Sequence, residues 1–293
     1  MDLDLPQLHA LAAAVDEGSF DAAARVLSVT PSAVSQRIKA LEATAGQVLL
    51  LRGKPVQITE VGQAYLRLAR QITALTSELG ATTGRPDARP VVALAVNGDS
   101  LGTWVLPALA PLAGETCFDI RREDQDHSAA LLRQGVVMAA ITTAARPVQG
   151  CRVSRLGVMR YRPMASPAYV ARWLPDGPTL DALAAAPLLV FDRRDELQDT
   201  YLRRRTRRRL DPPRHHIPST ADFGTAVRLG MGWGMLPEEQ SADAEHAGDL
   251  VDIDPGRHVD VALNWQQWSL RTVALDRTAD AIRAAARVHL RRR

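Results

Sequence analysis

Cysteine is scarce in this chain. Only Cys117 and Cys151 occur in 293 residues, which excludes a disulfide-stapled fold and favours a reducing compartment. Histidine is sparse too, and the neighbouring pair His215-His216 has no further ligands at zinc-like spacing. We therefore expect neither a metal site nor a cofactor.

Long apolar runs are also missing. Apolar stretches such as residues 91–96 and 136–141 are far too short to span a bilayer. The N-terminal sequence MDLDLPQ is acidic and lacks the basic start and apolar core of a signal peptide. We therefore expect a cytoplasmic protein that has no membrane partner.

Signatures of catalysis are absent as well. The sequence has no nucleophile-elbow pattern, Gly-rich phosphate loop or cluster of metal ligands. Its 46% hydrophobic and 24% charged residues are typical of a soluble globular protein, long enough for two or three domains. The net charge of +3 fits a nucleic-acid partner but proves little, because much of it lies in the arginine run at residues 203–209.

One stretch, SFDAAARVLSVTPSAVSQRIKALE at residues 19–42, has the signals of two helices joined by a tight turn. Ser19 supplies the side-chain acceptor of a helix N-cap before an alanine-rich run. After a turn at residues 28–30, Thr30 can cap a second helix. Pro31 stands at the first position of that helix, where its missing N–H costs nothing. The stretch predicts a helix-turn-helix that binds DNA.

The second helix has one apolar stripe, because Val34, Ile38 and Leu41 fall at i, i+4 and i+7. Small or hydrogen-bonding residues lie on its other sides, where they can reach base edges or phosphates in a major groove. These candidates are Ser32, Ala33, Ser35, Gln36, Arg37 and Lys39. An ordinary helical hairpin facing water is the plain alternative. The caps, the turn and the donor face together favour DNA recognition.

A β-hairpin is predicted next, with strands at residues 48–51 and 56–58 on either side of Arg52-Gly53-Lys54-Pro55. As the wing of a winged helix-turn-helix, this hairpin would press Arg52 and Lys54 on the phosphate backbone. A plain hairpin with solvated charges is the alternative. The predicted DNA-binding domain covers residues 1–59.

A long linker helix follows Thr59, and its apolar residues alternate four and three apart. This is the a/d spacing of a heptad pattern, over about three heptads. The seam consists of Val61, Tyr65, Leu68, Ile72, Leu75 and Leu79. A seam this narrow favours a second helix, most simply the copy from another subunit. The predicted linker and hinge, residues 60–89, would therefore make a homodimer and repeat the DNA-reading helix on two half-sites.

From residue 90 onward, short apolar strands alternate with helical stretches, which predicts an α/β domain with a mostly parallel sheet. We divide residues 90–293 into lobe I, about 90–160 with 264–293, and lobe II, about 161–263. Strands are expected at residues 91–96, 118–121, 136–141, 188–191, 216–217, 234–236 and 261–265. Helices are expected at residues 101–112, 129–134, 196–209, 221–229 and 278–291.

A winged helix-turn-helix, a linker helix and a two-lobed α/β domain, in this order, resemble the LysR-type transcriptional regulators over the whole chain. The most specific part is the 19–42 stretch, followed by a Gly-containing wing and TEVGQAYL. More narrowly, VVALAVNGDSLGTWVLPALAPL, LLVFDRRDELQDTYL and STADF…GWGMLP resemble the LysG/ArgP branch. The arginine run at residues 203–209 is heavier than that branch leads one to expect.

The resemblance implies a transcriptional regulator that binds promoter DNA and is switched by a small effector. It implies an effector domain of periplasmic-binding-protein type and a basic amino acid, lysine, arginine or histidine, as the effector. Control of an amino acid exporter or a related gene and assembly as a homotetramer, a dimer of dimers, are further expectations. RNA polymerase is a candidate partner at the promoter.

A free amino acid offers a carboxylate, an α-ammonium and a side chain, and each needs a partner. Candidates stand where predicted strands end and helices begin. They are Asn97, Asp99, Ser100, Thr142, Thr143, Asp192, Thr220, Asp222 and Phe223. Asp99, Asp192 and Asp222 would receive cationic groups, and Ser100 with backbone amides would hold the carboxylate. Any one of these residues could instead simply cap a helix.

Other functions stay open at this point. One is a LysR-type regulator of another metabolic pathway with a different small effector. Another is an architectural DNA-binding protein that needs no ligand. The least supported is an enzyme built on the two-lobed α/β domain, because the sequence lacks a catalytic motif.

Overall fold

The structure is a computed structural model that describes residues 3–51, 53–82, 89–123 and 128–292. Its contacts divide the chain into two compact units. The first consists of residues 1–95, 112–154 and 265–279, and the second of residues 96–111, 155–264 and 280–293. Across the described ranges, no helix is both long and apolar enough to cross a membrane.

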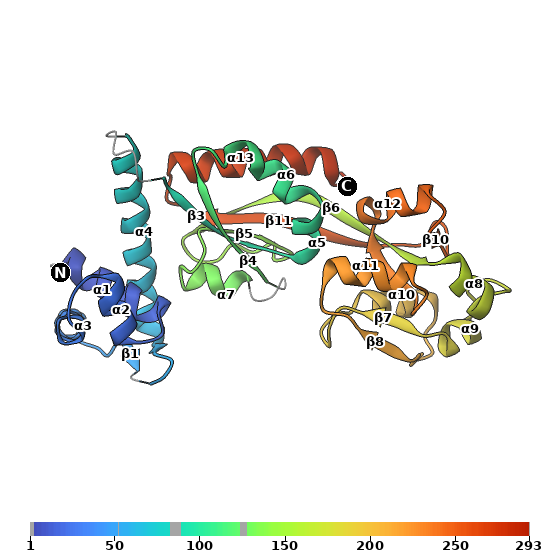
Figure 1. The fold of residues 1–293 in the computed structure, drawn as a ribbon, viewed down its shortest axis with the longest axis horizontal. Coiled ribbons are helices and arrows are strands. Elements are labelled where there is room, and N and C mark those ends of the chain that lie inside the picture. Colours follow the sequence, from blue (N-terminus) through green and yellow to red (C-terminus); the bar gives the residue numbers. More distant parts are fainter. Residues whose placement is uncertain (1–2, 52, 83–88, 124–127, 293) are drawn as a thin grey trace. The chain divides into compact units, whose positions relative to one another are not determined.

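The first unit begins with a winged helix-turn-helix. Helices α1 (Leu5–Asp16), α2 (Phe20–Val26) and α3 (Pro31–Ala45) gather beside the linker helix α4 (Glu60–Thr82) (Figure 1). The wing is a short antiparallel hairpin of β1 (Leu50–Leu51) and β2 (Gln57–Ile58), in which Leu50 pairs with Ile58. The predicted helix-turn-helix and wing are both confirmed, although the strands are shorter than expected.

The core of this winged helix-turn-helix is the apolar stripe of α3. Val34 and Leu41 are fully buried, Ile38 nearly so, and they pack in one cluster with Leu8 and Leu11 of α1. Burying an aliphatic side chain of this size stabilises a fold by about 1.5–3 kcal/mol. The i, i+4, i+7 spacing therefore fixes which face of α3 is inward, and leaves the donor-rich residues outward.

The linker helix packs partly on its own chain. Leu66 and Ala69 of α4 belong to the buried cluster, and Tyr65 and Ile72 of the predicted seam lie against it. Toward the far end of the helix the seam emerges: Leu75 is 43% and Leu79 is 63% exposed. The a/d spacing therefore includes residues that pack on the same chain as well as exposed ones, and the pattern alone does not separate the two.

Two arginines of α4 also join it to the segments before and after β5 in the same unit. Arg67 Nη1 donates to the Gln149 carbonyl at 3.0 Å, and Arg70 Nη1 donates to the Gln134 carbonyl at 3.1 Å. Arg70 forms an ion pair with Asp16 at the end of α1 as well. Gly135, at a φ of +69°, allows the close approach, because a Cβ there would stand 2.8 Å from the Arg67 Cα.

The large sheet has seven strands in the order β10-β6-β11-β5-β3-β4, with β9 also paired to β6. These strands are β3 (Val91–Val96), β4 (Cys117–Arg122), β5 (Ala139–Thr142), β6 (Cys151–Ala165), β9 (Gly234–Pro237), β10 (Val251–Asp252) and β11 (Val259–Trp268). Strands β3 and β5 are parallel, whereas β6 runs antiparallel to β9 and β10. The sheet is therefore mixed, whereas a mostly parallel sheet was predicted. The difference arises because the long strand β6, which pairs antiparallel with β9 and β10, was not predicted.

The helical stretch after β3 is continuous, formed by α5 (Gly98–Ser100), a π-helix (Leu101–Val105), α6 (Leu106–Leu109) and a 3-10 turn (Ala110–Leu112). Helix α7 (Ser128–Arg133) precedes β5, and α13 (Val273–His289) ends the chain. In the second unit, β7 (Leu188–Val190) and β8 (Arg214–His216) form a parallel pair.

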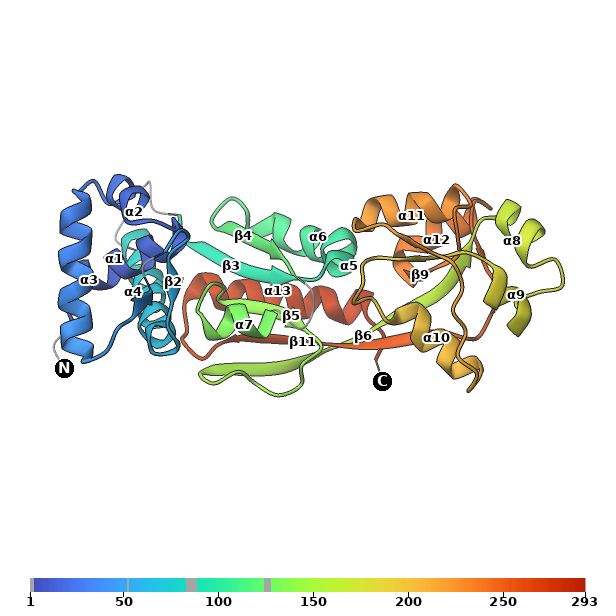
Figure 2. The same ribbon diagram turned by 90° about the horizontal axis from the view of Figure 1, so that it is seen from below.

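The remaining helices of the second unit are α8 (Pro167–Trp173), α9 (Leu180–Ala185), α10 (Leu197–Arg205), α11 (Thr220–Arg228) and α12 (Glu238–His246). Figure 2 shows α11 and α10 on either side of β9. Helix α10 ends at Arg205, whereas the predicted helix ran to residue 209. Helices α8, α9 and α12 were not predicted.

Candidate functional site

The recognition helix α3 begins as its capping residues predict. Thr30 Oγ1 accepts a hydrogen bond from the Ala33 amide at 3.2 Å, and Pro31 occupies the first helical turn. In the helix before it, Ser19 Oγ accepts from the Ala22 amide at 3.2 Å. Ser28 adopts a φ of 53°, a left-handed conformation that closes the turn between the helices. Both caps are confirmed, and they fix the position of α3 in the motif.

The candidate DNA contacts lie on the outer sides of α3. Ser32, Gln36 and Lys39 are exposed, while Ala33, Ser35 and Arg37 are half-buried. Because the opposite face is buried in the core, these side chains are available to a DNA groove. Their contacts with DNA stay a prediction.

The wing is tied directly to the recognition helix. Glu42 of α3 accepts hydrogen bonds at one carboxylate oxygen from the Leu49 amide at 2.9 Å and the Leu50 amide at 3.3 Å. Lys54, at the tip of the hairpin, is exposed. Arg52 lies outside the described residues, so only Lys54 of the predicted wing pair is seen. A helix and wing joined this way would approach DNA as one body.

A second candidate site begins where β3 leads into α5, in the second unit. Asp99 accepts a hydrogen bond from the phenol of Tyr161, a nearly fully buried residue of β6, at 2.7 Å. Burial raises the pKa of the Asp99 carboxyl, the Tyr161 hydrogen bond opposes this, and the charge of Asp195 raises it further. Burial and the neighbouring carboxyl raise the pKa of Tyr161 well above its usual value, so it remains a donor.

Asp195 is the second carboxyl of this site. It follows β7, and its two oxygens accept hydrogen bonds from the Phe191 amide at 2.9 Å and the Leu197 amide at 3.0 Å. Burial raises the pKa of Asp195, the two amides lower it, and the charge of Asp192 raises it. Two carboxyls in electrostatic contact, both partly removed from water, therefore have pKa values raised above those of exposed carboxyls.

Two buried polar groups beside Asp99 lack a partner in the described part of the chain. They are the Asn97 side-chain oxygen and the hydroxyl of Ser100, which has no exposed surface. The Thr220 hydroxyl and the Gln198 amide, by contrast, lower the pKa of Asp99 and of Asp195 by hydrogen bonding to them. An unsatisfied buried polar group costs about 1–3 kcal/mol. Such a cluster indicates a site that a polar ligand completes.

Other carboxylates of the second unit contrast with this pair. Asp199 binds Arg214 at 2.8 Å, Asp260 binds Arg160 at 2.8 Å, and Glu245 binds Arg162 at 2.5 Å. Asp254 pairs with Arg205 in the same way. For Asp99 and Asp195, by contrast, no lysine, arginine or histidine within the described residues forms an ion pair.

The other predicted effector residues lie in different surroundings. Asp192 Oδ1 accepts hydrogen bonds from the Arg194 and Asp195 amides at 2.7 and 3.0 Å, so it shapes the turn. Asp222 is exposed in the first turn of α11. Phe223 packs in the hydrophobic core of the second unit, close to Gly234. The part of these three residues in effector binding stays a prediction.

Thr142 and Thr143 belong to the first unit, at the end of β5. Thr142 is fully buried, and its hydroxyl accepts a hydrogen bond from the Ala144 amide at 3.1 Å. Their part in effector binding stays a prediction.

Three residues of the site were missed by sequence reasoning. Asp195 and Gln198 stand in the DRRDELQ segment, just beyond Asp192, which was chosen because it follows the predicted strand at residues 188–191. Tyr161 gave no signal, because no strand was predicted around it.

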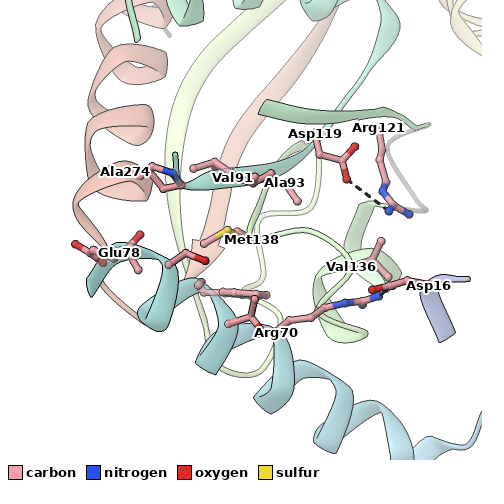
Figure 3. A pocket seen from close by; sticks show the side chains of 18 residues that line it. Asp16, Arg70, Glu78, Val91, Ala93, Asp119, Arg121, Val136, Met138 and Ala274 are labelled. Carbon is pink, nitrogen blue, oxygen red and sulfur yellow. Dashed lines mark hydrogen bonds and ion pairs between the residues drawn. The ribbon is translucent and has the colours of Figure 1, made fainter. Parts of the chain in front are cut away.

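A cavity in the first unit offers a contrasting case (Figure 3). It encloses about 270 Å³ between α4, α13 and the edge of the sheet. Its charged residues already have partners: Arg70 pairs with Asp16, and Arg121 with Asp119 at 3.6 Å. The Glu78 carboxylate accepts from a backbone amide of α13 at 2.7 Å. This cavity therefore lacks the unmet charge that distinguishes the Asp99–Asp195 site.

Comparison with known families gives two matches along the chain. Residues 5–63 match the family described as bacterial regulatory helix-turn-helix protein, lysR family. Residues 87–287 match the LysR substrate binding domain. The two matches cover the winged helix-turn-helix and the α/β part that holds the Asp99–Asp195 site.

Individual proteins are similar over nearly the whole chain. HTH-type transcriptional regulator LysG from Mycobacterium tuberculosis is 50% identical over 97% of this chain and 94% of its own length. The crystal structure of ArgP from Mycobacterium tuberculosis has 49% identity and a TM-score of 0.91, covering 100% of both chains. Full-length LysG from Corynebacterium glutamicum with bound effector Arg has 37% identity and a TM-score of 0.82, covering 99% of this chain and 100% of that one.

The outward face of α3 generates a prediction about DNA. Replacing Gln36 or Arg37 by Ala should relax base preference, with a loss of about 1–3 kcal/mol for each good base contact. Lys54→Ala should weaken binding to all DNA sequences alike and make the affinity less dependent on salt concentration, because the wing would contact phosphates. The measurement is binding to duplexes selected from a random pool by the wild-type protein.

Gln47→Ala is the matched control, because Gln47 is exposed just beyond the end of α3. It should leave affinity and base preference unchanged. Unchanged binding and specificity in the Gln36 and Arg37 variants would show that this face of α3 does not read the bases.

Proposed function

Because this chain belongs to the LysR family of bacterial regulatory helix-turn-helix proteins, we propose that it is switched by a basic amino acid bound at the Asp99–Asp195 site. As a member of this family the chain is a DNA-binding transcriptional regulator rather than an enzyme. The family also includes a domain for a small effector, which argues against a purely architectural DNA-binding role.

The observation that carries the proposal is the missing cation. Asp99 and Asp195 are both removed from water, yet neither forms the arginine pair that neighbouring carboxylates have. A buried ionised carboxylate is costly unless a cation compensates it. A ligand that brings positive charge would therefore gain more here than a neutral or acidic one.

The unpartnered Ser100 hydroxyl supports an amino acid in particular. It offers a donor for a carboxylate next to the carboxyl of Asp99, which suits an adjacent ammonium group. The relatives support the same class, since the Corynebacterium glutamicum LysG structure holds Arg as its effector. Lysine, arginine and histidine are thus the proposed effectors. A different small effector from another metabolic pathway is the second candidate, but it leaves the two carboxyls without a partner.

The regulated gene follows from the relatives' names. The protein from Corynebacterium glutamicum that is 40% identical over 96% of this chain is called lysine export transcriptional regulatory protein LysG. We extend this to control of an amino acid exporter or a related gene, with promoter DNA and RNA polymerase as partners in the bacterial cytoplasm. Effector binding can shift the DNA-bound state only by its difference in affinity for the two states.

Assembly through the linker helix is also part of the proposal. Leu75 and Leu79 stand one turn apart on α4 and are 43% and 63% exposed, which a second helix would cover. Two such helices would give a homodimer, and two dimers a homotetramer.

Changing both Leu75 and Leu79 to Glu should yield a monomer in light scattering, because like charges would face each other across the seam. Leu68 and Ile72 are less suitable for this test, since Ile72 also packs on the chain's own core. Thr76→Glu, an exposed residue beside the seam, is the control and should leave the assembly unchanged. A double mutant that still runs as a dimer or tetramer would exclude this seam as the main interface.

The effector itself is tested by thermal stability. Lysine or arginine at about 100 times its Kd should add about 2.7 kcal/mol of stability and raise Tm by several degrees. Leucine, glutamate and serine at the same concentration should not. Ser100→Ala should lower the affinity for every amino acid that binds, because the hydroxyl would hold the α-carboxylate that all amino acids have. Stabilisation by an apolar or acidic amino acid alone would contradict the basic-effector proposal while leaving the family assignment intact.

A further inference from the structure

The arginine run at residues 203–209 is the densest concentration of one charge in the chain, and neither the DNA-reading helices nor the Asp99–Asp195 site includes it. It holds six of the 36 lysines and arginines, and without it the chain would have more acidic than basic side chains. Residues 1–60, which contain the DNA-reading helices, also hold more aspartates and glutamates than lysines and arginines. The surplus positive charge of this DNA-binding protein therefore lies in its effector domain.

The first three arginines of the run have local structural reasons. Arg203, Arg204 and Arg205 form the last turn of α10, where positive charge is favourable because of the helix dipole. The side chain of Arg205 is only 15% exposed, and it pairs with Asp254. It also donates to the Pro178 carbonyl at 2.6 Å. These contacts fix the end of the helix and account for the first half of the run.

The last three arginines lie beyond the helix and have no such reason. Arg207, Arg208 and Arg209 are all exposed. Arg208 reaches Asp181 at 3.4 Å, but the two side chains are 66% and 91% exposed, and surface pairs of this kind contribute little. Neither Arg207 nor Arg209 forms an ion pair with any residue that the structure describes. Three consecutive guanidinium groups are therefore exposed with their charge largely uncompensated.

The turn that holds these three arginines does not depend on their side chains. The Thr206 hydroxyl accepts a hydrogen bond from the Arg208 backbone amide at 3.0 Å, which closes the turn without any guanidinium group. Concentrating like charges on a surface costs free energy unless a partner of opposite charge compensates them. Residues of other types would satisfy the fold at these positions, so the three charges indicate an external anionic partner.

We propose that the turn at residues 207–209 is a second DNA-contacting surface, which binds phosphates of the duplex outside the bases that α3 reads. Guanidinium groups donate in a planar fork to phosphate oxygens, and such contacts add affinity without base preference. Duplex DNA presents phosphates at short, regular intervals, which suits three successive arginines. DNA is also the polyanion that this family binds, which favours it over an acidic protein surface.

The test uses the full-length protein with Arg207→Gln, Arg208→Gln and Arg209→Gln combined. Its affinity is measured over a range of salt concentrations for a short duplex that the wild type selects from a random pool, and for the same duplex extended on both sides by random sequence. At low salt the wild type should bind the extended duplex at least about tenfold more tightly, and its log affinity should fall with log salt more steeply by about 0.9 for each added phosphate contact. The triple variant should lose most of this gain and keep its affinity and base preference on the short duplex.

Two further variants separate a phosphate contact from a change in net charge or in folding. Arg152→Gln, Arg155→Gln and Arg287→Gln combined remove the same charge from exposed arginines elsewhere. This control should keep most of the gain on the extended duplex. Lysine in place of all three turn arginines preserves the charge, and should also keep most of the gain.

Several results would overturn the inference. An equal loss in the glutamine variant and in the control would mean that net charge alone matters. An equal loss in the lysine and glutamine variants would mean that the charge of the turn does not matter. A wild type that gains nothing from the extension, or a glutamine variant that keeps the whole gain, would make the turn a solvated surface.

A partner other than DNA would show itself in a different assay. If the glutamine variant bound both duplexes like the wild type but supported less transcription with purified RNA polymerase, the turn would contact a protein and the DNA assignment would be wrong. None of these results bears on the basic-effector proposal, which is tested with ligands in the absence of DNA.

Discussion

Two carboxyl groups that lack a cation, Asp99 and Asp195, are the constraint on which this account of the effector site depends. Removing a carboxylate from water is expensive, and placing a second one in electrostatic contact adds repulsion. Elsewhere in the second unit, carboxylates such as Asp199 and Asp260 are compensated by ion pairs with arginines. Where it does not, the compensating charge must come from protons or from a bound molecule. A regulator gains from that arrangement, because the site is most stable only when its effector is present.

The DNA-reading part depends on a different constraint, the burial of one stripe of α3. Burial of Val34, Ile38 and Leu41 determines which side chains of α3 face outward. It also positions the wing, because Glu42 of α3 accepts hydrogen bonds from the Leu49 and Leu50 amides. Arg70 then connects the end of α1 to the Gln134 carbonyl. Within the first unit, the linker helix thus contacts both the DNA-reading helices and the segments on either side of β5. Strand β3 of the same sheet leads directly into Asn97 and Asp99.

Sequence reasoning succeeded where the information was local. The Ser19 and Thr30 caps, the α3 stripe and the first strand after residue 90 each depend on neighbours a few positions away. It failed where partners are distant in the chain. Tyr161 belongs to a strand that was not predicted, and its bond to Asp99 is a tertiary contact. Among the acidic residues after β7, spacing alone could not decide between Asp192 and Asp195, because the decision depends on which oxygens the backbone amides of the turn occupy.

Proton release on arginine binding tests the central claim most directly. Burial raises the pKa of both Asp99 and Asp195 in the free protein, and a bound cation should lower both again. Arginine keeps its own charge between about pH 5 and pH 7, so released protons must come from the protein. Titration calorimetry in buffers of different ionisation enthalpy should show net proton release that grows as the pH is lowered, and less release with citrulline. Net proton uptake on arginine binding would contradict the claim that arginine supplies the charge these two carboxyls lack.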